Sequence, residues 1–129
     1  MTLRVALATD DGIRFVDRHF GDAKYYYVYE IDELNVNFIR SIPNNSVDEK
    51  KHADPKKAKS IVKILKEDEV QVGVNLKFGP NIERVKRHFV PVIIDTESID
   101  QGLNKLIDNY DKLVELWDKG EERSYLSFK

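Results

Sequence analysis

The chain has 129 residues, a length typical of one compact domain and too short for two independent hydrophobic cores. It contains no cysteine, which excludes disulfide bonds, thiol nucleophiles and thiolate-ligated zinc or iron–sulfur centres. Charged residues make up 34% of the chain at a net charge of -2, a pattern that predicts a thermophilic protein, and the lack of a membrane span or export signal predicts a cytoplasmic one.

The first 42 residues are typical of three strands. Residues 3–9 are an apolar run that ends at Asp10, Asp11 and Gly12, a strong turn signal. Residues 24–32 contain four tyrosines and predict a second strand, and residues 36–42 predict a third strand that follows it through a hairpin. We therefore expect an antiparallel meander with the first strand inside the sheet.

Strands and helices then alternate along the chain. An apolar stripe at helical spacing follows Asp54 and Pro55, which are the expected cap and first residue of a helix. Residues 70–74 and 90–94 predict two further strands, and Gly79 opens a second helix between them. Because crossover helices join parallel strands, we expect the first, third, fourth and fifth strands to share one direction.

The C-terminal part is predicted to be one long helix and an apolar tail. Ser98 and Gln101 are typical of a capping box, and the apolar stripe that follows runs to about Lys119. The tail either folds back onto the sheet face or packs against a second subunit. We expect the tail to fold back onto its own chain and the protein to be a monomer.

This order of elements predicts an α/β protein with a five-stranded mixed sheet and helices packed on it. Four loops lie at the edge where the parallel strands end, and they comprise residues 10–23, 43–53, 75–80 and 95–98. Ligands of open α/β sheets collect at this edge, so we expect the functional site there.

Several motifs on this edge resemble those of one protein family. His19, Phe20, Gly21 and Ala23 form an HFGxA motif before the aromatic strand, His52 precedes the first helix, and residues 78–81 read Phe-Gly-Pro-Asn. In these features the chain is similar to the dinitrogenase iron-molybdenum cofactor biosynthesis family. The resemblance covers roughly residues 2–108, although residues 74–77 replace the family's usual glycine-rich stretch.

The resemblance implies a ribonuclease-H-like fold for residues 1–108, with residues 109–129 as a C-terminal helical extension and tail of the same domain. It also implies a non-enzymatic binding or carrier protein for a metal cluster, the iron-molybdenum cofactor or a related iron/molybdenum-sulfur species bound without cysteine. Its partners would be the cluster and the proteins that donate and accept it. The implied cofactor-binding residues are His19, Phe20, Gly21, His52, Gly79, Pro80 and Asn81, with His19 and His52 as metal ligands.

Each of these residues also has a purely structural interpretation. His19 can bond to backbone carbonyls while Phe20 fills the core, and His52 can be an exposed histidine among lysines. Gly79 and Pro80 can simply start a helix, with or without an anion bound to its amides. His88 is best explained by the dipole at the end of its helix.

Two other functions are weighed against the carrier. A magnesium-dependent nuclease-like enzyme would use Asp10 and Asp95, which end two strands at the same edge, but further carboxylates are lacking there because Glu30 and Asp32 lie toward the other end. A nucleic-acid-binding or anion-binding module would use Lys50, Lys51, Lys56, Lys57, Lys59 and Lys63. These lysines lack interleaved aromatic residues and the net charge is negative, so we do not expect nucleic-acid binding. Because further carboxylates are lacking at the sheet edge, we do not expect enzymatic activity either.

Overall fold

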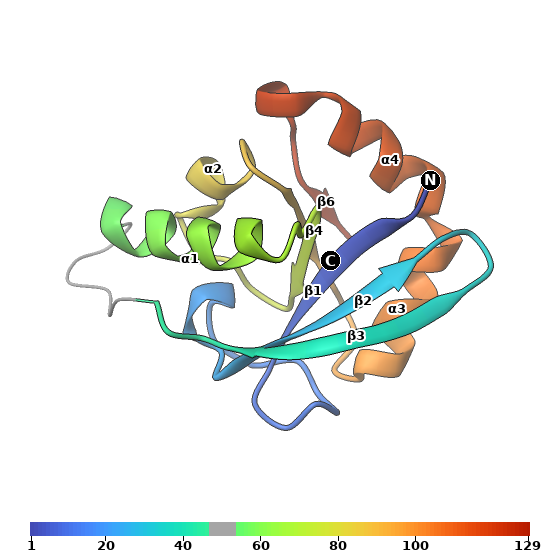
Figure 1. Cartoon of the computed structure of the whole chain (residues 1–129), viewed down its shortest axis with the longest axis horizontal. Coiled ribbons are helices and arrows are strands. Elements are labelled where there is room, and N and C mark those ends of the chain that lie inside the picture. Colours follow the sequence, from blue (N-terminus) through green and yellow to red (C-terminus); the bar gives the residue numbers. More distant parts are fainter. Residues whose placement is uncertain (47–53) are drawn as a thin grey trace.

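The computed structural model describes residues 1–46 and 54–129. One mixed sheet runs through the molecule in the strand order β3-β2-β1-β4-β5-β6 (Figure 1). Its strands are β1 (Leu3–Thr9), β2 (Tyr25–Ile31), β3 (Val36–Pro43), β4 (Val72–Asn75), β5 (Val90–Ile93) and β6 (Leu126–Ser127). The helices are α1 (Pro55–Glu67), α2 (Ile82–Val85), α3 (Ile99–Asp108) and α4 (Tyr110–Asp118), with short 3-10 turns η1 (Phe20–Asp22) and η2 (Gly120–Glu122).

The predicted strand arrangement is confirmed for the first five strands. β1 lies inside the sheet, antiparallel to β2 and parallel to β4. β3 is antiparallel to β2, and β5 is parallel to β4, so β1, β3, β4 and β5 share one direction. The α/β class and the antiparallel meander follow directly from these pairings.

The prediction of five strands is wrong because the tail adds a sixth. β6 pairs in parallel with β5 through two residues, Leu126 and Ser127, and the Phe128 amide donates to the Ile93 carbonyl over 2.9 Å. Two residues are too few to show an alternating pattern in the sequence. The tail therefore folds back, as expected, and it covers the sheet edge as well as one face.

Two helices differ from the prediction in length. The helix predicted to run to about Lys119 is interrupted at Asn109, whose side-chain amide donates to the Lys105 carbonyl over 2.8 Å and helps to end α3. Asparagine competes for backbone partners in this way, so it ends helices readily. The spacing of Ile82, Val85 and Phe89 predicts a second helix that extends to Phe89, whereas α2 ends at Val85.

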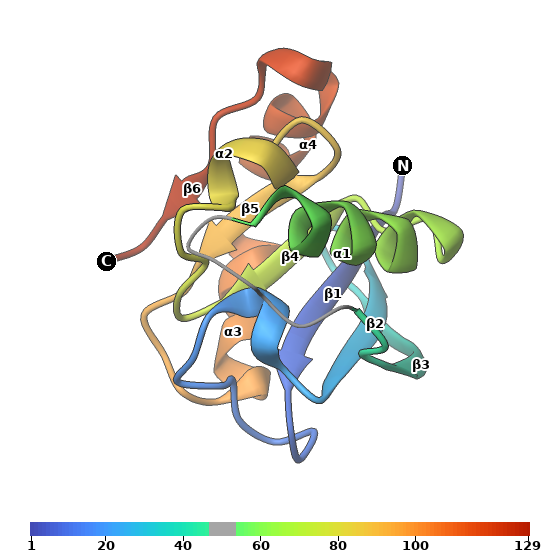
Figure 2. The same ribbon diagram turned by 90° about the vertical axis from the view of Figure 1, so that its left-hand side faces the viewer.

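Helices cover both faces of the sheet, as Figure 2 shows. On one face α3 and α4 pack against β1 residues Leu3, Val5 and Leu7. On the other face α1 and α2 pack against Ala6 and Ala8 of the same strand, whose small side chains let the helices approach. The caps of α1 and α3 are as predicted: Asp54 accepts from the Lys56 amide, and Ser98 accepts from the Gln101 amide.

Candidate functional site

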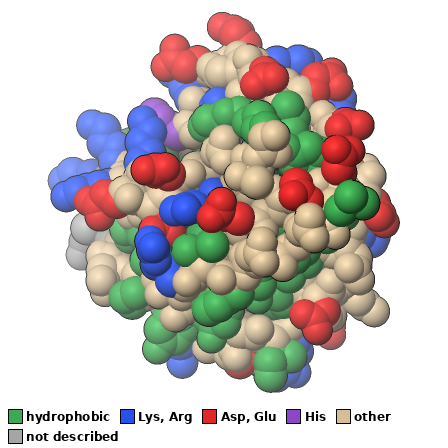
Figure 3. Space-filling model, turned by 45° about the vertical axis from the view of Figure 1, so that its right-hand side comes forward, with side chains coloured by type: hydrophobic (Ala, Val, Ile, Leu, Met, Phe, Trp, Pro, Cys, Tyr) green, Lys and Arg blue, Asp and Glu red, His purple; other side chains and the backbone are tan. Residues whose placement is uncertain are grey.

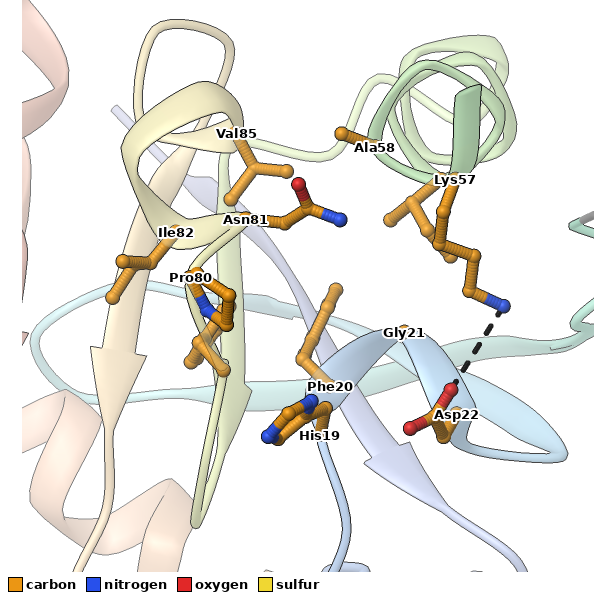
Figure 4. Close-up of a pocket in the computed structure, with 12 residues that line it drawn as sticks. His19, Phe20, Gly21, Asp22, Lys57, Ala58, Pro80, Asn81, Ile82 and Val85 are labelled. Carbon is orange, nitrogen blue, oxygen red and sulfur yellow. Dashed lines mark ion pairs between the residues drawn. The ribbon is translucent and has the colours of Figure 1, made fainter. Parts of the chain in front are cut away.

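A small pocket lies between η1, α1 and the start of α2, at the sheet edge where ligand sites were expected. Its cavity measures about 30 Å³, room for about one water molecule. Figure 4 shows Lys57 reaching from α1 toward Asp22, with His19 beneath Pro80. The lining residues are His19, Phe20, Gly21, Asp22, Lys57, Ala58, Ile61, Phe78, Pro80, Asn81, Ile82 and Val85.

His19 lies against Gly79, at the sheet edge where the functional site was expected. A Cβ atom at Gly79 would come within 2.7 Å of Nδ1 of the His19 ring, and Gly79 has a φ of +72°, which favours glycine. The imidazole is half-buried, and its nitrogens form no hydrogen bond with the residues that the structure describes. The alternative in which both nitrogens bond to backbone carbonyls is therefore wrong, and a ring nitrogen remains available to a ligand.

The loop that carries His19 is held in place by Asn75 at the end of β4. The Asn75 side-chain amide donates to the Arg18 carbonyl over 2.8 Å and to the Lys77 carbonyl over 3.0 Å. The Phe20 amide donates to the same Lys77 carbonyl over 2.9 Å. Asn75 is fully buried, so this residue, which stands in the stretch where the family is usually rich in glycine, fixes the distance between His19 and Gly79.

Phe20 fills the core, as its structural interpretation predicted. It is 2% exposed and stacks on Phe78 at a centroid distance of 4.7 Å. The Tyr26 ring contacts the Phe20 ring, and the Tyr26 hydroxyl donates a hydrogen bond to the Phe20 carbonyl over 2.8 Å. Phe20 therefore forms the rigid floor of the pocket and sets the backbone of the HFGxA motif.

Lys57 is the pocket residue whose role the sequence analysis did not foresee. It is 7% exposed, and its ammonium donates to Ser46 Oγ over 2.9 Å and lies 4.0 Å from an Asp22 carboxylate oxygen. Gly21 permits this approach, because a Cβ there would lie 3.2 Å from Lys57 Cε. One signal in the sequence could have found it, since Lys57 stands four residues before Ile61 on the buried face of α1.

The Gly79–Asn81 turn closes one side of the pocket. The amides of Ile82 and Glu83 donate to the carbonyls of Gly79 and Pro80, and α2 has only four residues, so these amides do not form the anion site considered from the sequence. The Asn81 side-chain amide instead donates to the Asp54 carbonyl over 3.2 Å. Asn81 thereby joins the start of α2 to the start of α1.

The two other histidines are not at this site. His52 lies outside the described residues, so its predicted role as a second ligand stays a prediction. His88 lies just after α2 at the opposite end of the sheet, where burial, together with Lys66, lowers its pKa. Within residues 1–46 and 54–129, no three His, Asp or Glu side chains come close enough together to hold a metal ion.

The carboxylates of the nuclease alternative are each bound to a cation. Asp10 accepts from Arg18 over 2.9 Å and from the Lys24 amide over 2.9 Å. Although partial burial opposes its ionisation, these two donors keep the pKa of Asp10 below its usual value. Asp95 pairs with Lys105, and that contact keeps its pKa low as well. The two aspartates therefore stabilise loops.

Among the lysines considered for nucleic-acid binding, Lys56 is exposed in the first turn of α1. Lys50 and Lys51 lie outside the described residues, and Lys57 is buried in the pocket. Lys59 and Lys63 are exposed on α1. None of the described helices is long and apolar enough to cross a membrane.

A sequence profile described as dinitrogenase iron-molybdenum cofactor matches residues 1–109. The chain belongs to this family. The matched part contains β1–β5, α1–α3 and every lining residue of the pocket, whereas α4 and β6 lie beyond it. No curated protein matches the chain significantly. The family is linked to the iron-molybdenum cofactor.

Proposed function

We propose that the protein is a non-enzymatic carrier that holds an iron–molybdenum cluster, or a related iron–sulfur-type species, as cargo at the His19 pocket. The observation that carries the proposal is the His19 imidazole, which is half-buried, lines the pocket and is not bonded to any described residue. A neutral imidazole is a good ligand for iron and related metals. In a chain without cysteine it is the strongest metal ligand of this pocket.

The size of the pocket favours binding at its mouth. A cavity of about 30 Å³ does not enclose a cluster of many atoms, so the cluster would rest on the rim formed by His19, Pro80 and Asn81. The Lys57 ammonium beneath the rim would attract an anionic cluster through a partly desolvated path, where charge interactions are stronger than in water. One ligand and one cation give weak, reversible holding, which suits a carrier.

Two further inferences accompany this proposal. We infer a ribonuclease-H-like fold, which an antiparallel meander followed by parallel strands supports. We also infer that the protein works in the cytoplasm and exchanges its cargo with donor and acceptor proteins, as its family membership favours.

The proposal is tested by loading the protein with isolated iron–molybdenum cofactor without oxygen and passing it through a desalting column. We expect the wild type to retain molybdenum and iron, His19→Ala to lose most of it, and Lys57→Met to retain less. His88→Ala is the matched control, since His88 lies away from the pocket. Equal retention by wild type and His19→Ala would show that the site is elsewhere.

A further inference from the structure

A second, larger groove lies between α1 and α2 and opens to solvent beside the His19 pocket. Its volume is about 660 Å³, the size of an ordinary ligand site. It is lined by Pro55, Ala58, Lys59, Val62, Glu83, Arg84, Arg87 and His88. The two cavities share Ala58, so this groove and the His19 pocket occupy neighbouring sides of α1.

The floor of the groove is aliphatic. Pro55, Ala58 and Val62 come from one side of α1 and present no hydrogen-bonding side-chain atoms. No Phe, Tyr or Trp side chain is among the lining residues, and His88 is the one aromatic ring there. This floor suits small aliphatic side chains of a peptide.

The rim of the groove is basic. Lys59 and Arg87 are exposed and form no ion pair with any described residue, whereas the acidic Glu83 is already paired with Lys86 at 2.6 Å. Figure 3 shows Lys and Arg side chains gathered beside a histidine on one side of the molecule. The whole chain has a net charge of -2, so this cationic rim is a local feature.

The environment of His88 reports the same positive field. Burial is the main cause of its lowered pKa, and Lys66, Arg123 and Arg87 lower it further while Glu121 alone opposes them. A cationic field around an aliphatic floor is complementary to carboxylates that accompany aliphatic side chains. The same field would be neutralised by an acidic occupant.

We propose that the α1–α2 groove is a docking surface for an acidic segment of another protein, with aliphatic side chains on the floor and carboxylates on the Lys59 and Arg87 rim. The segment would then lie next to the His19 pocket, where a partner that exchanges cargo would need to be. The docking itself does not depend on what the pocket holds, so either proposal can fail without the other.

The test uses the full chain and a fluorescent helical peptide with glutamates on one face and leucines on the other. A matched peptide replaces the leucines with serines and keeps the charge, and a short single-stranded RNA is the third probe. We expect the Glu–Leu peptide to bind about tenfold more tightly than the other two probes. We also expect the bound peptide to raise the pKa of the His88 imidazole, measured by NMR.

Charge-reversal variants locate the site. Lys59→Glu with Arg87→Glu should weaken Glu–Leu peptide binding by about tenfold or more, because both substitutions place like charges on the rim. Lys112→Glu with Lys119→Glu makes the same change of charge on exposed residues of the α4 region and should leave binding within about threefold. All four side chains are exposed, so the variants should fold like the wild type.

Four results would overturn the proposal. Equal weakening by both variant pairs would show that binding depends only on net charge. Tighter binding of the RNA, or equal binding of the serine peptide, would show that the groove does not select an acidic, aliphatic segment. Self-association of the chain that Lys59→Glu with Arg87→Glu abolishes would identify a second copy as the occupant.

Discussion

Gly79 and His19 depend on each other at the scale of single residues. The positive φ of Gly79 costs any other L-residue about 1–2 kcal/mol, and a Cβ there would also collide with the imidazole. We expect Gly79→Ala to lower the free energy of unfolding by at least that amount and to shift the NMR signals of the His19 ring.

Gly120 provides the matched control for this experiment. It has a φ of +60°, and a Cβ there would meet nothing within 4 Å. Gly120→Ala should therefore show the backbone cost alone and leave the His19 signals in place. If Gly79→Ala left those signals unchanged as well, the contact between Gly79 and His19 would not exist in solution.

The Asp11 carboxyl makes the free energy of unfolding depend on pH in the acidic range. Its carboxylate accepts from the amides of Arg14 and Ile13, and these bonds, with the Arg14 guanidinium, lower its pKa to about 2. Since the pKa is lower in the folded chain than in the unfolded chain, the unfolded state binds more protons between the two values. This contribution is complete above the unfolded pKa, about 4, and is lost as the pH falls toward 2.

Urea unfolding at pH 5 and at pH 2.5 measures that contribution. The wild type should lose stability on acidification, and Asp11→Asn, which cannot titrate, should lose less over the same interval. Identical losses in the two proteins would mean that the Asp11 turn is not formed or does not perturb its carboxyl.

Asp10 separates the carrier from the nuclease alternative. Because Arg18 and the Lys24 amide occupy its carboxylate, we expect no magnesium-dependent cleavage of labelled RNA or DNA by the wild type. Asp10→Asn should lower the melting temperature through loss of the Arg18 ion pair and leave cluster retention unchanged. Cleavage that requires magnesium and disappears in Asp10→Asn would establish an enzyme instead.

At the scale of elements, the C-terminal tail contributes stability. Leu126 and Phe128 pack against the α3–α4 core, and β6 pairs with β5. Deletion of residues 124–129 should therefore lower the melting temperature. The oligomeric state should not change, because the tail folds onto its own chain.

Removal of Lys129 alone is the control for that deletion. Sedimentation velocity shows whether each protein is a monomer or a dimer. A parent that sediments as a dimer and becomes a monomer after the deletion would show that the tail serves association between subunits.

Some secondary-structure elements could be predicted from the sequence and others could not. The meander, the parallel strands and the caps at Asp54 and Ser98 were predictable because period, turn residues and capping side chains are local signals. β6 and the break at Asn109 were not, because two paired residues have no period and the apolar stripe continues through the break. The meeting of His19 with Gly79 followed from topology, since both stand in loops at one sheet edge.

The burial of the Lys57 side chain in the pocket could not be predicted from the local sequence. A lysine in a run of lysines is typical of an exposed helix face, and the neighbours that bury this one, Ser46 and Gly21, come from distant loops. The buried face of α1 was visible in the sequence, but the placement of an ammonium there depends on tertiary packing.

At the scale of the whole molecule, helices cover both faces of the sheet, and both candidate binding surfaces lie on one side. The His19 pocket and the α1–α2 groove both lie along α1, whereas α3, α4 and β6 close the other face and the far edge. Both proposed binding surfaces therefore lie on the α1 side of the molecule, and the tail packs on the opposite side. The high share of charged residues and their ion pairs also predict a thermophilic protein with a high melting temperature.

The central claim, that the protein carries a metal cluster without cysteine, is tested most directly by metal analysis of the chain purified without oxygen and then mixed with isolated iron–molybdenum cofactor. We predict molybdenum and iron that stay with the protein through gel filtration, together with a visible absorption band, in the wild type. A wild-type protein that elutes free of both metals would contradict the claim.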